Sequence, residues 1–283
     1  MRQTSSVLYI AADSLLPERR KSIAGFDEFT AALDHAGIPA VWLTSRSRLQ
    51  FDEPRRKLGH AHPFIAEDGC GVYLPEDYFH LRPDSVGDRS RKGSTLRLGR
   101  FTCIPFAEAL PAAADALEAL SQEVEVPIVT LRSLSPRELT QNTGLPPREA
   151  ELVRQRDFDE LFFFAGASQT QTEQFLADGR KGGMEFRQHG VLWSAAVGAS
   201  MQRCIAAVSK LYDRALRYHA HSVGVATADL ASSLFPFCDR RILLAEGESE
   251  ATPKCQRYPR TLEVPLLSAD VWEQVLESVF TKS

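Results

Sequence analysis

The chain has 283 residues, of which 43% are hydrophobic and 25% charged, and these values exclude a disordered, collagen-like or low-complexity protein. The formal net charge is −4 at pH 7, and because a dedicated nucleic-acid binder is normally basic, we expect no nucleic-acid partner. No apolar stretch reaches the roughly 20 residues that span a bilayer. The apolar run 7–12 lacks the basic flank of a signal peptide, so we expect a cytoplasmic protein without a membrane partner.

The first third of the chain alternates short apolar runs with amphipathic segments. Continuous apolar runs are typical of strands buried on both faces of a sheet, and apolar residues three or four apart are typical of helices. The predicted strands are residues 7–12, 39–43, 63–66 and 71–74, and the predicted helices are residues 26–36 and 47–58. Alternating strands and helices with short links predict a parallel sheet with right-handed crossovers.

The middle of the chain follows a different pattern. A basic loop rich in glycine and serine is expected over 84–99, and the sequence from Ser135 to Glu138 has the form of a capped helix start. The other predicted helices are 106–120, 147–156 and 170–176, and the predicted strands are 124–131, 160–165, 184–189 and 191–195. These elements suit a second domain in which helices pack on a small antiparallel sheet.

The last third returns to the α/β pattern. Helices are predicted at 199–218, 229–235 and 271–280, strands at 222–226 and 241–244, and a polar loop at 246–260. We therefore divide the chain into a core formed by 1–84 and 190–283 and an inserted domain at 85–189. The cleft between the two domains is the expected binding site.

Five segments, in order along the chain, carry a resemblance to a known enzyme family. They are residues 7–16 (VLYIAADSLL), 41–46 (VWLTSR), 63–75 (PFIAEDGCGVYLP), 156–164 (RDFDELFFF) and 224–234, the last followed by Cys238 and Asp239. On these segments the chain resembles the haloacid dehalogenase (HAD) superfamily, and specifically its mannosyl-3-phosphoglycerate phosphatase branch. The resemblance implies a Rossmann-like α/β core with a parallel sheet and an inserted α+β cap domain.

The resemblance also implies a reaction, the hydrolysis of a phosphomonoester through a phosphoaspartyl intermediate. That reaction needs a nucleophilic carboxylate, a second carboxylate as general acid and base, and Mg²⁺ held by carboxylates. A lysine and a hydroxyl group neutralise the phosphoryl oxygens. By resemblance, Asp13 is the surviving catalytic acid, Asp13 and Asp229 are the metal ligands, and Thr44, Ser45 and Arg46 bind phosphate.

Three positions of the resemblance carry apolar residues instead of functional groups. Ala11 falls at the position of the nucleophile, Val225 at that of the first metal-binding acid of the fourth motif, and Met201 at that of the lysine. In a shifted register Asp13 takes the position of the nucleophile, and the position of the general acid then falls on Leu15, which has no carboxylate. Two carboxylates alone bind a hard dication weakly, and losing a nucleophile typically costs about 10⁴ to 10⁶ in rate. We therefore expect a catalytically impaired, phosphatase-like protein with no cofactor, or with Mg²⁺ where activity remains.

The remaining candidate residues lie in a turn and at the edge of the cap. Glu67 and Asp68 stand in the turn, and Arg156, Asp157 and Glu160 stand where a cap helix meets a strand. The resemblance implies that these residues line a pocket for a small phosphorylated or carboxylated sugar. The alternatives are Asx chemistry in the turn, a solvated helix end with weak charge pairs, and helix capping by Ser45 or Ser47.

Two further groups of residues have structural interpretations that we favour. The five scattered cysteines are expected to be buried thiols rather than disulfides. A set of basic side chains could steer an anion toward the cleft, although a solvated loop accounts for most of them. The set is Arg89, Arg91, Lys92, Arg97, Arg100, Arg180, Lys181 and Arg187.

Three functional classes remain open at the level of sequence. The first is a non-catalytic protein that keeps a cleft for an anionic sugar metabolite. The second is an active, Mg²⁺-dependent phosphomonoesterase acting on mannosyl- or glucosyl-3-phosphoglycerate. The third is an interaction subunit, whose protein partner the sequence does not identify.

Overall fold

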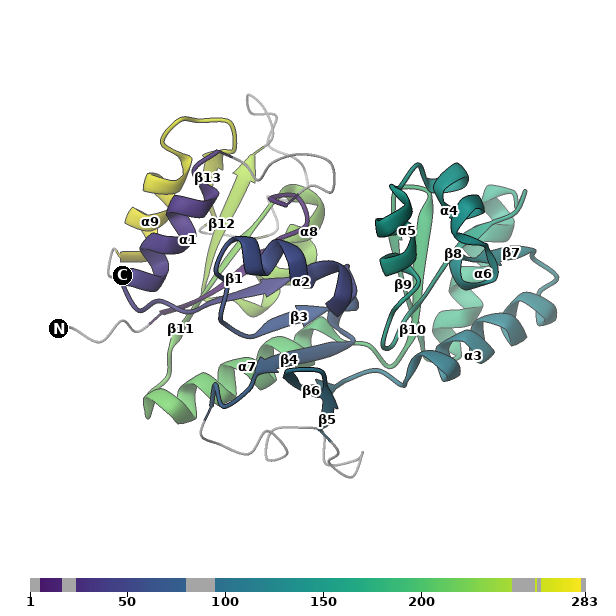
Figure 1. Cartoon of the computed structure of the whole chain (residues 1–283), viewed down its shortest axis with the longest axis horizontal. Helices are drawn as coiled ribbons and strands as arrows, with labels where there is room; N and C mark the ends of the chain where they lie inside the picture. Colours follow the sequence, from purple (N-terminus) through teal and green to yellow (C-terminus); the bar gives the residue numbers. More distant parts are fainter. Residues whose placement is uncertain (1–5, 17–23, 80–94, 246–257, 259–260, 281–283) are drawn as a thin grey trace.

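Each of two bodies, lying side by side, is built on its own β-sheet (Figure 1). The structure is a computed structural model, and it describes residues 6–16, 24–79, 95–245, 258 and 261–280. The larger body is the core and the smaller is the cap, and the chain passes from core to cap and back. The expected class, an α/β core with an inserted α+β domain, is confirmed.

The core is organised around a nine-stranded sheet with the order β13-β12-β11-β1-β2-β3-β4-β6-β5. The strands from β13 to β3 run parallel, and β4, β6 and β5 extend the sheet with antiparallel pairing. The strands are β1 Ser6–Ala11, β2 Ala40–Leu43, β3 Phe64–Ala66, β4 Gly71–Pro75, β5 Leu96–Leu98, β6 Phe101–Pro105, β11 His221–Ala226, β12 Arg240–Ala245 and β13 Thr261–Pro265.

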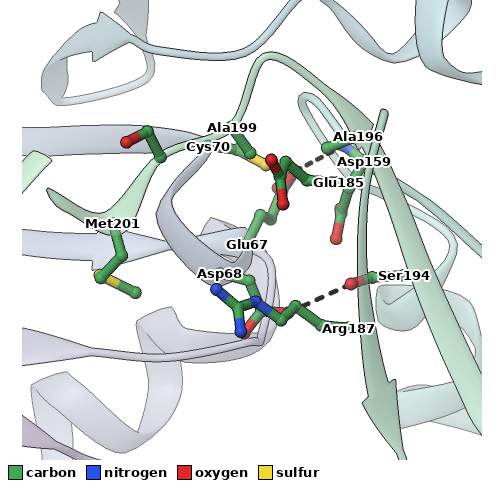
Figure 2. Close-up of a pocket in the computed structure, with 11 residues that line it drawn as sticks. Glu67, Asp68, Cys70, Asp159, Glu185, Arg187, Ser194, Ala196, Ala199 and Met201 are labelled. Carbon is green, nitrogen blue, oxygen red and sulfur yellow. Dashed lines mark hydrogen bonds between the residues drawn. The ribbon is translucent and has the colours of Figure 1, made fainter. Parts of the chain in front are cut away.

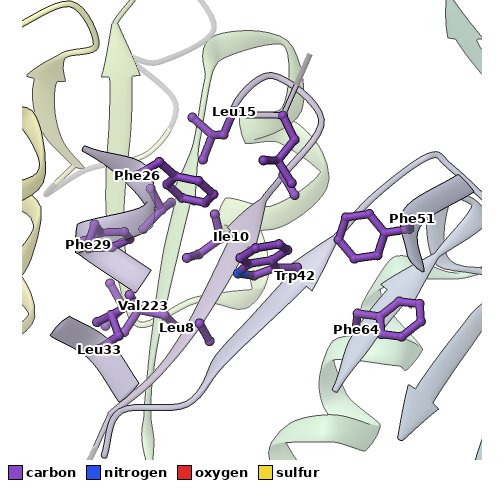
Figure 3. Close-up of a cluster of buried hydrophobic side chains, with 14 of the residues drawn as sticks. Leu8, Ile10, Leu15, Phe26, Phe29, Leu33, Trp42, Phe51, Phe64 and Val223 are labelled. Atoms are coloured by element: carbon purple, nitrogen blue, oxygen red, sulfur yellow. The ribbon is translucent and has the colours of Figure 1, made fainter. Parts of the chain in front are cut away.

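Helices cover both faces of the core sheet. One face carries α1 Phe26–His35, α2 Arg48–Lys57 and α9 Val271–Phe280 (Figure 3), and the other carries α7 Met201–Leu216 and α8 Ala228–Leu234. In β1, Leu8 and Ile10 pack toward the first group of helices, whereas Tyr9 and Ala11 pack toward the second. This two-sided burial is the reason that β1 reads as a continuous apolar run.

The cap contains an antiparallel sheet of four strands in the order β7-β8-β10-β9. Its strands are β7 Ile128–Thr130, β8 Glu160–Phe164, β9 Met184–His189 and β10 Leu192–Val197. Its helices are α3 Leu110–Glu123, α4 Pro136–Thr143, α5 Pro147–Val153 and α6 Gln169–Lys181. The predicted helix start at Ser135 is confirmed, because its hydroxyl accepts from the Glu138 amide while the Glu138 carboxylate accepts from the Ser135 amide.

The strand pairing differs from the sequence prediction at both ends of the cap. β5 and β6 belong to the nine-stranded sheet and β10 belongs to the cap sheet, whereas the predicted cap covered 85–189. β5, β6 and β13 were not predicted as strands, and the expected loop 84–99 contains β5 in its described part. Residues 84–94, and all of the expected loop 246–260 except 258, lie outside the described residues. Short edge strands depend on long-range pairing, which hydrophobic periodicity does not report.

Two predictions about side chains and membrane segments can be compared directly with the fold. The four cysteines in the described part, Cys70, Cys103, Cys204 and Cys238, are buried free thiols, as expected. Within the ranges that the structure describes, no helix is long and apolar enough to cross a membrane.

The ring of Phe26 joins α1 to the core sheet and to α9. Phe26 is fully buried, with its ring centroid 5.6 Å from that of Trp42 and 5.1 Å from that of Trp272. We expect Phe26→Ala to lower the free energy of unfolding by about 3–5 kcal/mol, measured by urea denaturation. Phe280→Ala, at a side chain that is 52% exposed, is the control and should change it by less than about 0.5 kcal/mol. Equal effects of the two variants would contradict this.

Candidate functional site

The carboxyl ends of the parallel strands meet at one edge of the core sheet, where open α/β sheets bind ligands. Ala11 ends β1 and pairs with Leu43 at the end of β2. The loops that follow these strands bring Asp13 beside Thr44. A pocket at this edge, here called the core pocket, is lined by residues that include Ala11, Asp13, Thr44, Ser45, Arg187 and Met201. The structure therefore brings the first two motifs together with the start of α7.

The Asp13 carboxylate is held by the groups that the sequence predicted to bind phosphate. Its Oδ1 accepts from the Thr44 hydroxyl and its Oδ2 accepts from the Ser45 amide at 2.7 Å. The Nε of Arg46 lies 4.0 Å from Oδ1, and the Arg46 guanidinium also donates to the carbonyl of Leu16. Thr44 and Ser45 thus direct their donors at Asp13 rather than at the open pocket.

Helix capping at the start of α2 involves Ser47 and not Ser45. The Ser47 hydroxyl accepts from the amide of Gln50, and the Gln50 side chain accepts from the amide of Ser47. This reciprocal arrangement satisfies two donors at the helix start. The amide of Ser45 therefore remains available for its bond to Asp13.

Two of the three apolar replacements lie in the core pocket. Ala11 presents its methyl group at the end of β1, and Met201 is the first residue of α7, with Ser200 as its N-cap. Neither side chain can act as a nucleophile or a cation. At these two positions the pocket wall is apolar beside Asp13.

The third replacement, Val225, requires a correction, because it does not face the pocket. Val225 pairs with Ile10 across β11 and β1, and both side chains are buried on the α1 face of the sheet. Ala11 and Ala226 point to the opposite face. Successive side chains of a strand alternate between faces, so Val225 is turned away from the face of the sheet that carries Ala11.

The predicted metal pair of Asp13 and Asp229 is also not assembled. Asp229 is exposed in the first turn of α8, where its carboxylate accepts from the Thr227 hydroxyl, and it does not line the core pocket. In the part of the chain that the structure covers, no three or more His, Cys, Asp or Glu side chains cluster to hold a metal. The predicted pair therefore does not fit a Mg²⁺ ion, because Asp13 without Asp229 would hold a hard dication only weakly.

Glu67 connects the core to the cap. It begins the 3₁₀ turn η1, Glu67–Gly69, and its buried carboxylate accepts three amides of the cap, from Asp157 at 2.9 Å, Phe158 at 2.8 Å and Asp159 at 3.1 Å. Burial, together with the charge of Asp159, raises the pKa of Glu67 well above its usual range. The predicted role of Glu67 in a sugar pocket becomes a role in joining the domains, although its side chain also lines a second pocket.

The other residues predicted to contact substrate take part in the same junction. Arg156 donates to both carboxylate oxygens of Asp159 and, at 2.6 Å, to the carbonyl of Ser45 in the core. Asp157 accepts from the Arg48 Nε at 3.2 Å and from the Tyr73 hydroxyl at 2.8 Å. Although burial favours its neutral form, the charges of Asp159 and Glu67 raise the pKa of Arg156.

Glu160 belongs to the cap alone. It is buried at the start of β8, where its Oε2 lies 3.2 Å from the Nε of Arg132, and burial raises its pKa. Glu160, Arg156 and Asp157 line neither of the two pockets described here. These three residues are neither a solvated helix end nor an open sugar site, because their charges are used in buried and half-buried contacts.

A second pocket adjoins the first and is here called the cap pocket (Figure 2). It lies between η1 and the cap strands β9 and β10, and its lining includes Asp68, Glu185, Arg187, Ser194 and Met201. Three of these residues, Asp68, Arg187 and Met201, also line the core pocket. The two pockets therefore form one continuous candidate site between core and cap.

Asp68 links the turn of the core to both cap strands of this site. Its Oδ2 accepts from the Nε2 of His189 at 2.7 Å and from the hydroxyl of Ser194 at 3.2 Å. Burial raises the pKa of Asp68, but the hydrogen bond and charge of His189 outweigh it, so the pKa is lowered. Burial lowers the pKa of His189, but Asp68 outweighs it, so that pKa is raised.

Sequence reasoning missed His189 and named Arg187 only within a basic group. Both lie on the same side of β9 as Glu185, whereas Met184 and Phe186 are buried against the cap helices. The alternation of apolar and polar residues from Met184 to Arg187 was the signal that the sequence offered. It did not identify the elements that would face the exposed side.

Comparisons with known proteins show what the chain is similar to in sequence and in fold. No protein-family model matches the sequence. The chain is 23% identical over 190 residues to a glucosyl-3-phosphoglycerate/mannosyl-3-phosphoglycerate phosphatase of Methanococcoides burtonii, covering 66% of each protein. A protein of the same description from Persephonella marina is 26% identical over 180 residues, covering 62% of this chain and 61% of that one. The matches span less than two thirds of these relatives' lengths.

Solved structures extend the likeness over the whole fold. BT1666 of Bacteroides thetaiotaomicron, a phosphatase of the HAD superfamily, aligns with a TM-score of 0.62 at 15% identity, covering 99% of this chain and 97% of that one. The chain therefore has the HAD fold, and its sequence is similar to mannosyl- and glucosyl-3-phosphoglycerate phosphatases.

The first prediction from this site concerns the junction residue Glu67. Glu67→Ala leaves three buried amides of the cap without their acceptor, so we expect the free energy of unfolding to fall by about 3 kcal/mol or more. Urea denaturation measures this loss. The control is Glu76→Ala, at an exposed carboxylate paired with Arg97, which should change stability by less than about 0.5 kcal/mol. A wild-type stability in Glu67→Ala would argue against the junction.

The second prediction concerns pH. The pKa of His189 is higher in the folded state than in the unfolded state, where it is about 6.5. The charged His189 therefore contributes its full stabilisation of the fold below about pH 6.5, and this stabilisation is lost as the pH rises through the folded-state pKa. The lowered pKa of Asp68 makes its contribution present above about 3.9 and lost as the pH falls through the folded value. We therefore expect His189→Gln to destabilise the protein more at pH 5.5 than at pH 9.

Urea unfolding at these two pH values measures that difference. The Asp68→Asn background is the control, because it removes the charge that raises the His189 pKa. In that background burial is the largest remaining influence on the His189 pKa, so the larger effect of His189→Gln at pH 5.5 should be lost or reversed. An effect of His189→Gln that is the same at both pH values in the wild-type background would contradict the pairing.

Proposed function

We propose that this chain is a phosphatase-like protein of the HAD fold that binds an anionic sugar metabolite between core and cap without transferring its phosphoryl group. The observation that carries the proposal is the position of Ala11 in the same pocket as Asp13 and Thr44. By resemblance, the residue at the end of β1 attacks phosphorus. A methyl group has no electron pair with which to do so.

The remaining polar groups of the core pocket favour binding over turnover. The Asp13 carboxylate accepts hydrogen bonds from the Thr44 hydroxyl and the Ser45 amide, so both of its oxygens already have partners in the core. Met201 offers no positive charge at the position of the family's lysine, and the residues do not fit Mg²⁺. Each of these differences removes part of the stabilisation of the phosphoryl transition state.

The ligand class is inferred from the site and from the relatives. The linings of the two adjoining pockets combine apolar residues with carboxylates, hydroxyls and one guanidinium group, a mixture that suits a sugar carrying an acidic group. The relatives are named for mannosyl- and glucosyl-3-phosphoglycerate, which combine a sugar, a phosphate and a carboxylate. We therefore propose a metabolite of this class as the ligand.

The proposal predicts binding without turnover. Titration with mannosyl-3-phosphoglycerate should raise the melting temperature, because a ligand that binds the native state stabilises it by RT ln(1 + [L]/Kd). A phosphate-release assay on the same sample should stay at the no-protein background, with or without Mg²⁺. Asp229→Asn, which changes a carboxylate outside both pockets, is the matched control and should bind as the wild type does.

Two other outcomes would select the alternative functions. Mg²⁺-dependent phosphate release that is lost in Asp13→Asn but kept in Asp229→Asn would establish an active phosphatase and overturn the proposal. No thermal shift and no phosphate release would favour the interaction subunit instead.

A further inference from the structure

Arg187 is the one cationic side chain among the described residues that line the core pocket and the cap pocket, and it lines both. The other charged groups of these linings are carboxylates, among them Asp13, Asp68 and Glu185. An anion that enters the site would meet this guanidinium as its only full positive charge. Arg187 is therefore the first residue to consider as the binding partner of an anion.

The strand β9 directs Arg187 toward the core. Arg187 pairs with Ser194 across β9 and β10, and it lies on the same side of β9 as His189, which bonds to Asp68 in the core. In Figure 2 the guanidinium of Arg187 extends from β9 toward Asp68, and Met201 lies across the pocket. The cap strand β9 thus places the Arg187 guanidinium opposite Met201, the apolar residue at the start of α7.

The guanidinium is available to a ligand. Among the described residues, no hydrogen bond or ion pair holds it, and its side chain is exposed. The nearby Asp68 carboxylate already accepts from His189 and Ser194. The charge of Arg187 acts on Asp68 only as one of several contributions that lower its pKa. Arg187 can therefore bind a ligand without breaking a hydrogen bond or ion pair to any described residue.

The core does not supply the same function. The Thr44 hydroxyl and the Ser45 amide are directed at Asp13, and Arg46 lies beside Asp13 and donates to Leu16. The core element that favours an anion is the start of the 16-residue helix α7, where Ser200 and Met201 line the cap pocket. The positive end of a helix dipole favours negative charge there, and Arg187 adds a full charge beside it.

We propose that Arg187 is a ligand-binding residue whose guanidinium binds the oxyanion group of the metabolite across the cleft, replacing from the cap the positive charge that is missing at Met201. The inference rests on the proposed function, which supplies the anionic ligand. A guanidinium binds either a phosphate or a carboxylate through two parallel hydrogen bonds. The shared chemistry of the ligand is therefore a planar or tetrahedral oxyanion.

Isothermal titration of the full chain with mannosyl-3-phosphoglycerate tests the assignment. Arg187→Ala should weaken binding by about 10- to 100-fold, the range expected for loss of a charged hydrogen-bonding partner. Arg187→Lys should bind with intermediate affinity, because a lysine keeps the charge but loses the paired geometry. The matched control is Arg180→Ala, an exposed arginine of the cap helix α6 that lines neither pocket, and it should bind as the wild type does.

A rescue variant separates a binding role from a structural one. Adding Met201→Lys to Arg187→Ala places a new cation in the same two pockets, and it should regain at least part of the lost affinity. Unfolding of each variant in urea confirms that it is folded at the titration temperature. Failure of the lysine to restore any affinity would overturn charge replacement.

Simpler probes identify the oxyanion that Arg187 binds. If the oxyanion is a phosphate, Arg187→Ala should weaken the binding of glycerol 3-phosphate and leave the binding of glycerate unchanged. If it is a carboxylate, Arg187→Ala should weaken the binding of glycerate and leave that of glycerol 3-phosphate unchanged. If the wild type binds mannosyl-3-phosphoglycerate and Arg187→Ala binds it within twofold, the assignment is wrong and the proposed function stands. If the wild type binds none of these probes, the proposed function itself is wrong, and the assignment of Arg187 with it.

Discussion

The contact on which the site depends is the one between the Glu67 carboxylate and three consecutive amides of the cap. A buried carboxylate needs several donors to be tolerated, and here those donors belong to the other domain. These three hydrogen bonds therefore fix the position of residues 157–159 of the cap relative to Glu67, which follows β3 directly. Because β8, β9 and β10 form one sheet, fixing residues 157–159 also fixes the strand that carries Arg187.

The turn that presents Glu67 packs closely against the start of α7 within the core. Glu67, Asp68 and Gly69 all have positive φ angles, of 51°, 55° and 95°, and only the glycine adopts this region without a steric cost. A Cβ atom on Gly69 would lie 2.7 Å from the backbone nitrogen of Met201. The left-handed turn is thus the arrangement that brings Glu67 under the cap, Asp68 against His189, and α7 against the pocket at the same time.

Much of this protein can be predicted from its sequence. Runs such as 7–12 have the composition of strands buried on both faces, and Ser135 and Ser47 start helices through local side-chain bonds. The apolar residues Ala11 and Met201 are equally plain, because the chemistry that a side chain lacks is a property of the residue type. These predictions depend on local chemistry and on periodicity, which a linear sequence contains in full.

Contacts between the domains could not be predicted in this way. The sequence motif assigned Val225 to the pocket, but strand alternation turns its side chain to the opposite face of the sheet. The resemblance assigned Arg156 and Asp157 to ligand binding, whereas in the structure their side chains join core to cap. The residue types alone identified the apolar position of the first motif, Ala11. Only the tertiary structure decided which charges are used in the junction and that Arg187 faces the pocket, because hydrogen bonds between residues about 90 positions apart leave no mark in any local pattern.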